Sequence, residues 1–98
     1  MRLTNTERDT IVSQAKQCFG PATRIMLFGS RTDDSRRGGD IDLLVQGQWE
    51  GREALQCKIR FLVEVKARLG DQRIDVVMAV PGDRRPIVEE ATREGVAL

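Results

Sequence analysis

Two aspartates stand at the start of a segment that otherwise has the pattern of an apolar strand. Asp40 and Asp42 open the run DIDLLV, with only Ile41 between them. Residues i and i+2 of a strand point to the same face, about 6.6–7 Å apart along the chain, and Ile41 would point the other way into a core. Two carboxylates this close repel one another, and a divalent cation removes that repulsion. The pair therefore predicts a metal site; the simpler alternative is that both aspartates only cap a strand at the surface.

Magnesium fits this pair best, because Mg²⁺ prefers oxygen ligands and takes its remaining ligands from water and phosphates. Two ions about 3.5–4 Å apart would use both carboxylates as bridging ligands, as in two-metal phosphoryl chemistry. A third aspartate, Asp75, opens a later apolar run, RIDVVMAV. Asp75 could be a further ligand that also accepts a proton from an attacking hydroxyl. Alternatively, it is a strand-edge residue paired with Arg73 or another arginine.

The pair Gly29-Ser30 ends the apolar run RIMLF, upstream of the aspartates. A strand that ends in Gly-Ser and turns into a loop or short helix offers backbone N–H groups and a hydroxyl to a phosphate. The same pair is also an ordinary turn, and the chain contains neither the GxxxxGK[ST] nor the GxGxxG pattern. Arg31 follows directly and could contact phosphate. An equally good interpretation is that Arg31 is only solvated or paired with an acidic residue.

The absence of histidine narrows the chemistry further. The 98 residues contain no His, which excludes Ser-His and Cys-His nucleophile pairs and a histidine base. The net charge is +1, from 16 basic and 15 acidic side chains, so a dedicated polyanion binder and direct nucleic-acid binding are not expected. An enzyme built from this chain must work with carboxylates, basic side chains and metal.

Cysteine usage and hydropathy predict a cytoplasmic protein without membrane association. No apolar run approaches the roughly 18 residues of a membrane span, and the polar start MRLTNTERDT has no secretory signal. Cys18 and Cys57 fall within helical patterns beside apolar neighbours, and we expect buried free thiols rather than a disulfide. Without CxxC spacing or histidine, no zinc site is expected.

The spacing of apolar residues predicts one domain, residues 1–98, in which helices and strands alternate. The expected elements are helices over residues 6–19, 51–70 and 86–94 and strands over 24–28, 40–45 and 73–80. Thr6 or Asn5 could cap the first helix, and residues 96–98 could add a short edge strand. We expect an α+β fold, a small mixed β-sheet with the helices packed on one side of it.

The predicted helix over 51–70 is apolar on more than one face. Its main stripe consists of Leu55, Ile59, Leu62, Val63, Lys66 and Leu69. Ala54, Phe61 and Val65 lie on an adjoining face, so the apolar surface is wider than one-sided packing needs. This extra face could be core that packs on the sheet or a surface for a partner protein, and both interpretations stay open.

The candidate residues follow one another in an informative order: Gly29-Ser30, then Asp40-Ile41-Asp42 after nine residues, then Asp75 beyond the long helix. In this order and spacing the chain resembles the DNA polymerase beta-like nucleotidyltransferases, whose motif is Gly-Ser, then Asp-x-Asp, then a later third Asp. The resemblance covers most of the chain, including the final REGVAL. More narrowly, the chain is similar to the minimal nucleotidyltransferase (MNT) family, stand-alone catalytic domains that are often partners of a small helical HEPN protein.

This resemblance implies a polymerase beta-like nucleotidyltransferase fold and an antitoxin that transfers AMP from ATP to a tyrosine of a HEPN ribonuclease toxin. It implies that Gly29 and Ser30 hold the β- and γ-phosphates of ATP. Asp40 and Asp42 would bind two Mg²⁺ ions. Asp75 would complete the second metal site and assist deprotonation of the attacking hydroxyl.

Two other functions stay open. The chain could be an antitoxin that only occludes its toxin, although a pure binder need not retain three costly carboxylates. It could also be the catalytic half of a small-molecule nucleotidyltransferase, of the aminoglycoside-modifying kind. A domain of this size can form a triphosphate cleft but hardly a separate acceptor-binding domain, which argues against that third function. The same argument predicts that another chain or a second copy brings the acceptor, so a hetero-oligomer is expected.

Overall fold

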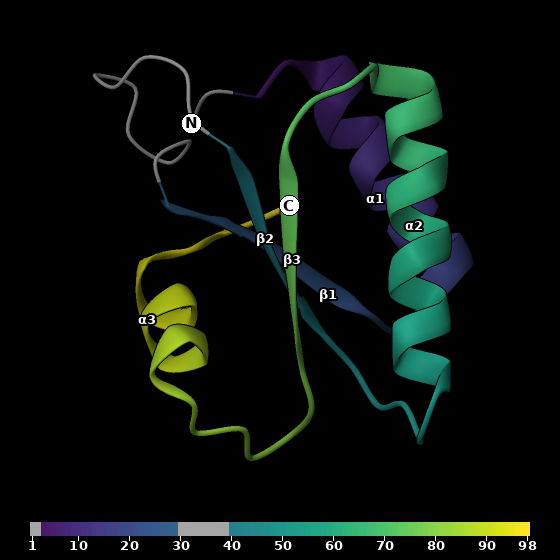
Figure 1. Cartoon of the computed structure of the whole chain (residues 1–98). Helices are drawn as coiled ribbons and strands as arrows, with labels where there is room; N and C mark the ends of the chain where they lie inside the picture. The colour runs from purple at the N-terminus through teal and green to yellow at the C-terminus, as the bar shows by residue number, and fades with distance from the viewer. Residues whose placement is uncertain (1–2, 30–39) are drawn as a thin grey trace.

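The computed structural model describes residues 3–29 and 40–98, which form three helices and four strands (Figure 1). In chain order the elements are α1 (Asn5–Phe19), β1 (Arg24–Phe28), β2 (Ile41–Gln46), α2 (Glu53–Leu69), β3 (Ile74–Ala79), α3 (Pro86–Glu94) and β4 (Val96–Ala97). Each expected element is present in the expected order, and the ends differ from the sequence expectation by one or two residues at most. The α+β class is confirmed.

Helix α1 begins at a capping box earlier than expected. Thr4 is the N-cap: its Oγ1 accepts a hydrogen bond of 3.0 Å from the Glu7 N–H, and Glu7 Oε1 accepts one of 2.9 Å from the Thr4 N–H. This reciprocal pair satisfies two backbone donors that the start of a helix otherwise leaves unpaired. The expectation of Asn5 or Thr6 as the cap is wrong, because neither has a glutamate or glutamine three residues later.

The four strands form one mixed sheet in the order β3-β2-β1-β4. Strand β1 runs antiparallel to both β2 and β4, whereas β2 and β3 run parallel. A parallel pair needs a crossover connection, and α2 lies in that connection. As a result, the end of β1 and the starts of β2 and β3 lie together at one end of the sheet (Figure 1).

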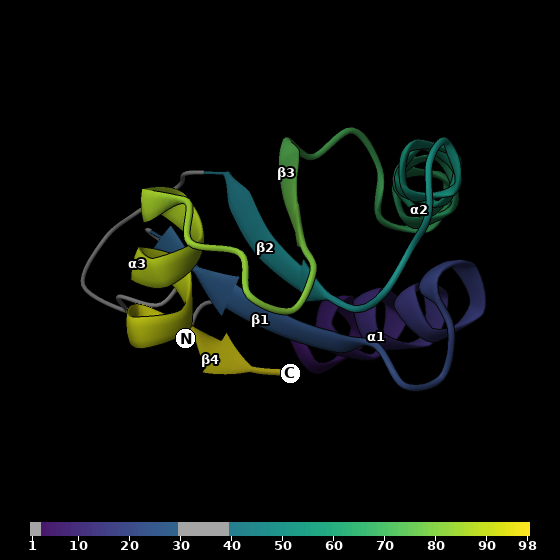
Figure 2. The ribbon, with the colours of Figure 1, turned by 90° about the horizontal axis from the view of Figure 1, so that it is seen from below.

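The helices cover both faces of the sheet, and the expectation that they pack on one side is wrong. Helices α1 and α2 lie over one face, while α3 packs on the other, where Val88 and Ala91 contact Leu44 and Ala79 (Figure 2). The reason lies in β2, in which the consecutive residues Leu43 and Leu44 are both fully buried. Consecutive side chains of a strand point to opposite faces, so this strand has to be covered on both.

Helix α2 buries the face that the sequence left undecided and exposes the centre of its main stripe. Phe61 and Val65 are fully buried, and the Phe61 ring lies 5.2 Å from the ring of Phe19 in α1. In contrast, Leu55, Ile59 and Val63 are 60%, 54% and 60% exposed. Leu62 and Leu69, at the border of the stripe, are partly buried against the core. The helix packs mainly against α1, which explains why only one side of it is covered.

Both cysteines are free thiols, as predicted, but they differ in burial. Cys18 is buried, and burial raises the pKa of its thiol, whereas Cys57 is only partly buried. The burial of Cys18 fits its position on the inner side of α1. None of the helices that the structure describes is both long enough and apolar enough to cross a membrane.

Candidate functional site

Strands β2 and β3 place Asp42 and Asp75 next to one another. Asp42 is the register partner of Asp75 in the parallel ladder and of Phe28 in the antiparallel ladder with β1. Leu44, two residues after Asp42, packs under α3, so the two aspartates belong to the sheet face that α3 covers in part. Ile41 points to the opposite face and is fully buried, as the sequence predicted. The site therefore lies at the end of the sheet where β2 and β3 begin.

The Asp42 carboxyl group has an unusual environment. Its pKa is raised above the ordinary value of 3.8, first by burial, then by the charges of Asp75 and Asp40, and further by a hydrogen bond with the Asp75 side chain. The acidic residues therefore interact as a group, and either a shared proton or a cation relieves their repulsion.

Gly29 lies directly beside this carboxylate. Its φ is +75°, and a Cβ atom built on Gly29 would collide with Asp42 Oδ2. Any other residue would thus combine an unfavourable backbone conformation with a steric clash against Asp42. The chain leaves β1 in contact with the Asp42 carboxylate, so the glycine of the Gly-Ser pair and the second aspartate of the Asp-x-Asp pair share one site.

Asp40 lies opposite Arg73, a residue that sequence reasoning considered only as a partner for Asp75. Arg73 Nε is 4.0 Å from Asp40 Oδ1, and the Ile41 N–H donates a hydrogen bond of 2.9 Å to the Arg73 carbonyl oxygen. Because Ile41 pairs with Ile74, the residues that precede them also come together. No ion pair joins Asp75 to an arginine within residues 3–29 and 40–98. The parallel register of β2 and β3 is what places Arg73 beside Asp40, and the sequence did not reveal that register.

The aspartates supply oxygen donors without enclosing a cation by themselves. Over the described residues, no group of three or more His, Cys, Asp or Glu is arranged to hold a metal ion. Mg²⁺, however, usually takes one or two protein carboxylates and completes its shell with water and substrate phosphates. The donor chemistry of Asp42 and Asp75, whose mutual repulsion a cation would relieve, fits such an open site. The remaining ligands would then come from a nucleotide and water.

The structure brings some of the predicted site residues together and does not describe others. Gly29, Asp42 and Asp75 come together, and Asp40 lies at the same end of the sheet beside Arg73. The predicted phosphate ligands Ser30 and Arg31 lie outside the described residues.

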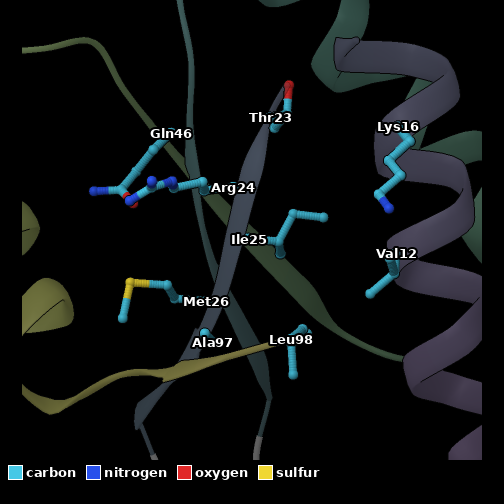
Figure 3. A pocket seen from close by; sticks show the side chains of 9 residues that line it. All are labelled: Val12, Lys16, Thr23, Arg24, Ile25, Met26, Gln46, Ala97 and Leu98. Carbon is cyan, nitrogen blue, oxygen red and sulfur yellow. The ribbon is translucent and has the colours of Figure 1, made fainter. Parts of the chain in front are cut away.

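A separate pocket of about 440 Å³ lies at the other end of β1 (Figure 3). Val12 and Lys16 of α1 face Ile25 and Leu98 across it, and Arg24 lines it from the start of β1. None of the predicted site residues that the structure describes lines this pocket. The hollow and the carboxylate group are therefore distinct features of the domain.

Comparisons with known proteins return no match, either to a protein-family model or to a curated protein. The architecture, three helices and a small mixed four-stranded sheet, is compatible with the fold that the motif order implies. A functional assignment therefore rests on the geometry around Asp42 and on the resemblance in motif order.

Proposed function

We propose that this chain is a Mg²⁺-dependent nucleotidyltransferase of the polymerase beta-like fold that transfers AMP from ATP to a protein. One observation carries the proposal: Asp42 and Asp75 are partners on parallel strands, and the chain leaves β1 through Gly29 in contact with the Asp42 carboxylate. The glycine of a motif that resembles a phosphate-binding turn is thereby adjacent to the carboxylates that resemble metal ligands. Triphosphate and metal would meet at one end of the sheet.

The residues of the site suit the binding of a metal–nucleotide complex. Asp40 and Asp42 would hold two Mg²⁺ ions, and Asp75 would complete the second ion's protein ligands. When bound, Mg²⁺ neutralises the charge of the triphosphate and polarises the reacting phosphoryl group. The partial burial of Asp42 supports this role, because a carboxylate that is partly withdrawn from water attracts a cation more strongly.

Transfer would be an in-line displacement at the α-phosphorus of ATP. The acceptor hydroxyl oxygen forms a bond to the α-phosphorus, the bond from that phosphorus to the oxygen bridging the β-phosphate breaks, and pyrophosphate leaves. Asp75, which is exposed, accepts the hydroxyl proton at a carboxylate oxygen. Gly29 lets the backbone approach the outer phosphates, with Ser30 and Arg31 as the proposed side-chain ligands.

For the acceptor, we propose a tyrosine hydroxyl of a cognate HEPN ribonuclease toxin, so that the chain acts as an antitoxin in a hetero-oligomer. This part of the proposal rests on the similarity to the minimal nucleotidyltransferase family. The free thiols of Cys18 and Cys57 agree with a reducing compartment, and we place the reaction in the cytoplasm.

The test is the transfer of label from α-labelled ATP to the partner in the presence of Mg²⁺. The wild-type chain should label the partner and release one pyrophosphate for each AMP transferred, and Asp42→Asn should lower the rate about a hundredfold or more. Asp9→Asn, which changes an exposed carboxylate on α1 outside the site, is the matched control and should keep the wild-type rate. An unlabelled partner at saturating ATP and Mg²⁺ would refute the proposal, and label on a small hydroxylated compound alone would favour a small-molecule transferase.

A second candidate is an antitoxin that acts by binding alone, which the exposed apolar residues of α2 favour because they lie outside the carboxylate site. The double variant Asp40→Ala, Asp42→Ala separates the two functions. If transfer is required, this variant should still form the complex but no longer protect cells from the toxin. If occlusion is sufficient, it should protect as well as the wild type.

A further inference from the structure

Helix α2 presents three aliphatic side chains to solvent in one line. Leu55, Ile59 and Val63 follow one another at intervals of four residues and are 60%, 54% and 60% exposed. Residues i and i+4 of a helix share a face, so the three side chains form a continuous ridge over about two turns. Single exposed apolar residues are ordinary, whereas an aligned group marks a contact surface. We call these three residues the α2 stripe.

The stripe is not needed for the packing of the domain itself. Phe61 and Val65, on another side of α2, already supply its fully buried contacts with the core. Figure 2 shows α2 nearly end-on, at the side of the molecule away from α3 and next to α1. The stripe therefore remains uncovered after the helix has packed.

Basic residues border the stripe on all sides. Arg52 and Lys66 lie seven residues before and after Ile59, two turns away on the same line, while Lys58 and Arg60 lie about 100° around the helix to either side of Ile59. Within the part of the chain that the structure describes, none of these four cations forms an ion pair. An incoming surface would therefore meet an apolar ridge framed by uncompensated positive charge.

The acidic residues of the helix lie elsewhere. At about 100° per residue, Glu53 and Glu64 are roughly 120–140° around the helix from Ile59. Glu64 Oε2 also accepts a hydrogen bond of 2.7 Å from Arg68 Nη1. Arg52, Lys58 and Lys66 therefore have no acidic residue three or four positions away on the helix, whereas Arg60 lies one turn from Glu64.

A second copy of this chain fits the stripe poorly. Antiparallel pairing centred on Ile59 would place Arg52 against Lys66 of the second copy, and parallel pairing would place each of these cations against itself. Like charges opposed across a helix pair destabilise it. The charge pattern selects instead for a partner with negative residues around an apolar seam.

We propose that the α2 stripe docks an amphipathic helix of another protein, one whose apolar seam is bordered by glutamate and aspartate. The seam would cover Leu55, Ile59 and Val63, and the acidic border would pair with the surrounding cations, as in helix recognition through i, i+4 and i+7 anchors. This inference goes beyond nucleotide transfer and does not depend on it, because none of the stripe residues belongs to the carboxylate site.

The test uses two synthetic helical peptides that share one leucine seam, one bordered by glutamate and the other by lysine. Fluorescence anisotropy of each labelled peptide, titrated with the full chain, should show binding of the glutamate peptide and about tenfold or weaker binding of the lysine peptide. Added salt should weaken binding of the glutamate peptide, since part of its affinity comes from exposed charge pairs. Ile59→Gln should lower its affinity about tenfold or more, because it removes a buried aliphatic contact.

The matched control is Ile87→Gln, the same change at an isoleucine of α3 that is 43% exposed, and it should leave peptide binding unaltered. The double variant Arg52→Gln, Lys66→Gln should retain the fold and reduce the preference for the glutamate peptide. Equal binding of both peptides, binding of neither, or wild-type affinity in Ile59→Gln overturns the proposal. A concentration-dependent dimer in sedimentation that Ile59→Gln abolishes would assign the stripe to a second copy and likewise overturn it.

Discussion

Asp42 and Asp75 lie opposite one another on parallel strands, and the pKa of Asp42 is raised first by its own burial and then by the charge of Asp75. Parallel strands are usually apolar along their length, because they tend to be buried on both faces. Here Asp42 is half-buried and Asp75 is exposed, and two neighbouring carboxylates lower the stability of the domain unless a proton or a cation relieves their repulsion. We therefore expect the stability of this protein to depend on pH and on divalent cations.

Replacing Asp42 by Asn should stabilise the metal-free protein at neutral pH. Burial, and then the charges of Asp75 and Asp40, raise the pKa of Asp42 above 3.8, so the folded protein holds this proton to higher pH than the unfolded chain does. At a pH below the pKa of Asp42 in the unfolded chain, Asp42 therefore does not lower the free energy of unfolding. The destabilisation grows as the pH rises towards the pKa of Asp42 in the folded protein, and it is complete above that pKa. The difference in free energy of unfolding between Asp42→Asn and wild type, measured in urea, should rise through the acid range and then level off.

The matched control for this series is Asp9→Asn, an exposed position that should show no comparable rise. Mg²⁺ should reduce the difference in free energy of unfolding between Asp42→Asn and wild type, because a cation that binds only the folded wild type stabilises it by mass action. A difference that does not change with pH would contradict an electrostatic origin of the stabilisation.

Gly29→Ala should destabilise the domain more than Gly82→Ala does. The φ angles are alike, +75° and +84°, so both variants pay about 1 kcal/mol or more for the left-handed backbone conformation. Only at Gly29 does the new Cβ collide with Asp42, whereas nothing lies within 4 Å of a Cβ at Gly82. We expect an additional loss of about 1–3 kcal/mol in the free energy of unfolding. In an Asp42→Ala background, Gly29→Ala and Gly82→Ala should lower the free energy of unfolding by about the same amount. If Gly29→Ala is still the more destabilising of the two there, the clash with Asp42 is not the cause.

Thr4→Ala should cost about 1 kcal/mol, because it removes the side chain that accepts a hydrogen bond from the Glu7 N–H at the start of α1. For a domain of this size the melting temperature should fall by about 4–8 °C. Thr6→Ala, an exposed residue in the first turn of the same helix, serves as the control and should stay within about 0.5 kcal/mol of wild type. Thermal unfolding followed by circular dichroism measures both, and an equal loss in the two variants would argue against Thr4 as the cap.

Phe61→Ala and Leu55→Ala should differ sharply although both change apolar residues of α2. Phe61 is fully buried and contacts Phe19, so its truncation should cost about 3–5 kcal/mol. Leu55 is 60% exposed, and its truncation should change the free energy of unfolding by about 0.5 kcal/mol or less. A large decrease in the free energy of unfolding of Leu55→Ala would mean that the α2 stripe is covered in the folded protein.

Local patterns were sufficient to predict each helix and strand within residues 3–29 and 40–98. The runs RIMLF and DIDLLV are short and apolar, and the stops Gly20-Pro21 and Gly70 are visible without knowledge of the fold. The order of Gly29, Asp40, Asp42 and Asp75 was likewise readable, because it depends on residue type and spacing alone. Pro86 and Gly95 bounded α3 correctly for the same reason.

The sequence by itself therefore determined the elements and which carboxylates were available for chemistry. Tertiary structure decided that Asp42 and Asp75 are register partners, that Arg73 lies beside Asp40, and that α3 covers the other face of the sheet from α1 and α2. It also decided which apolar side of α2 is core and which is exposed. Strand register and the choice between two apolar faces depend on contacts between segments far apart in the chain, and such contacts leave no mark in a local pattern of residues.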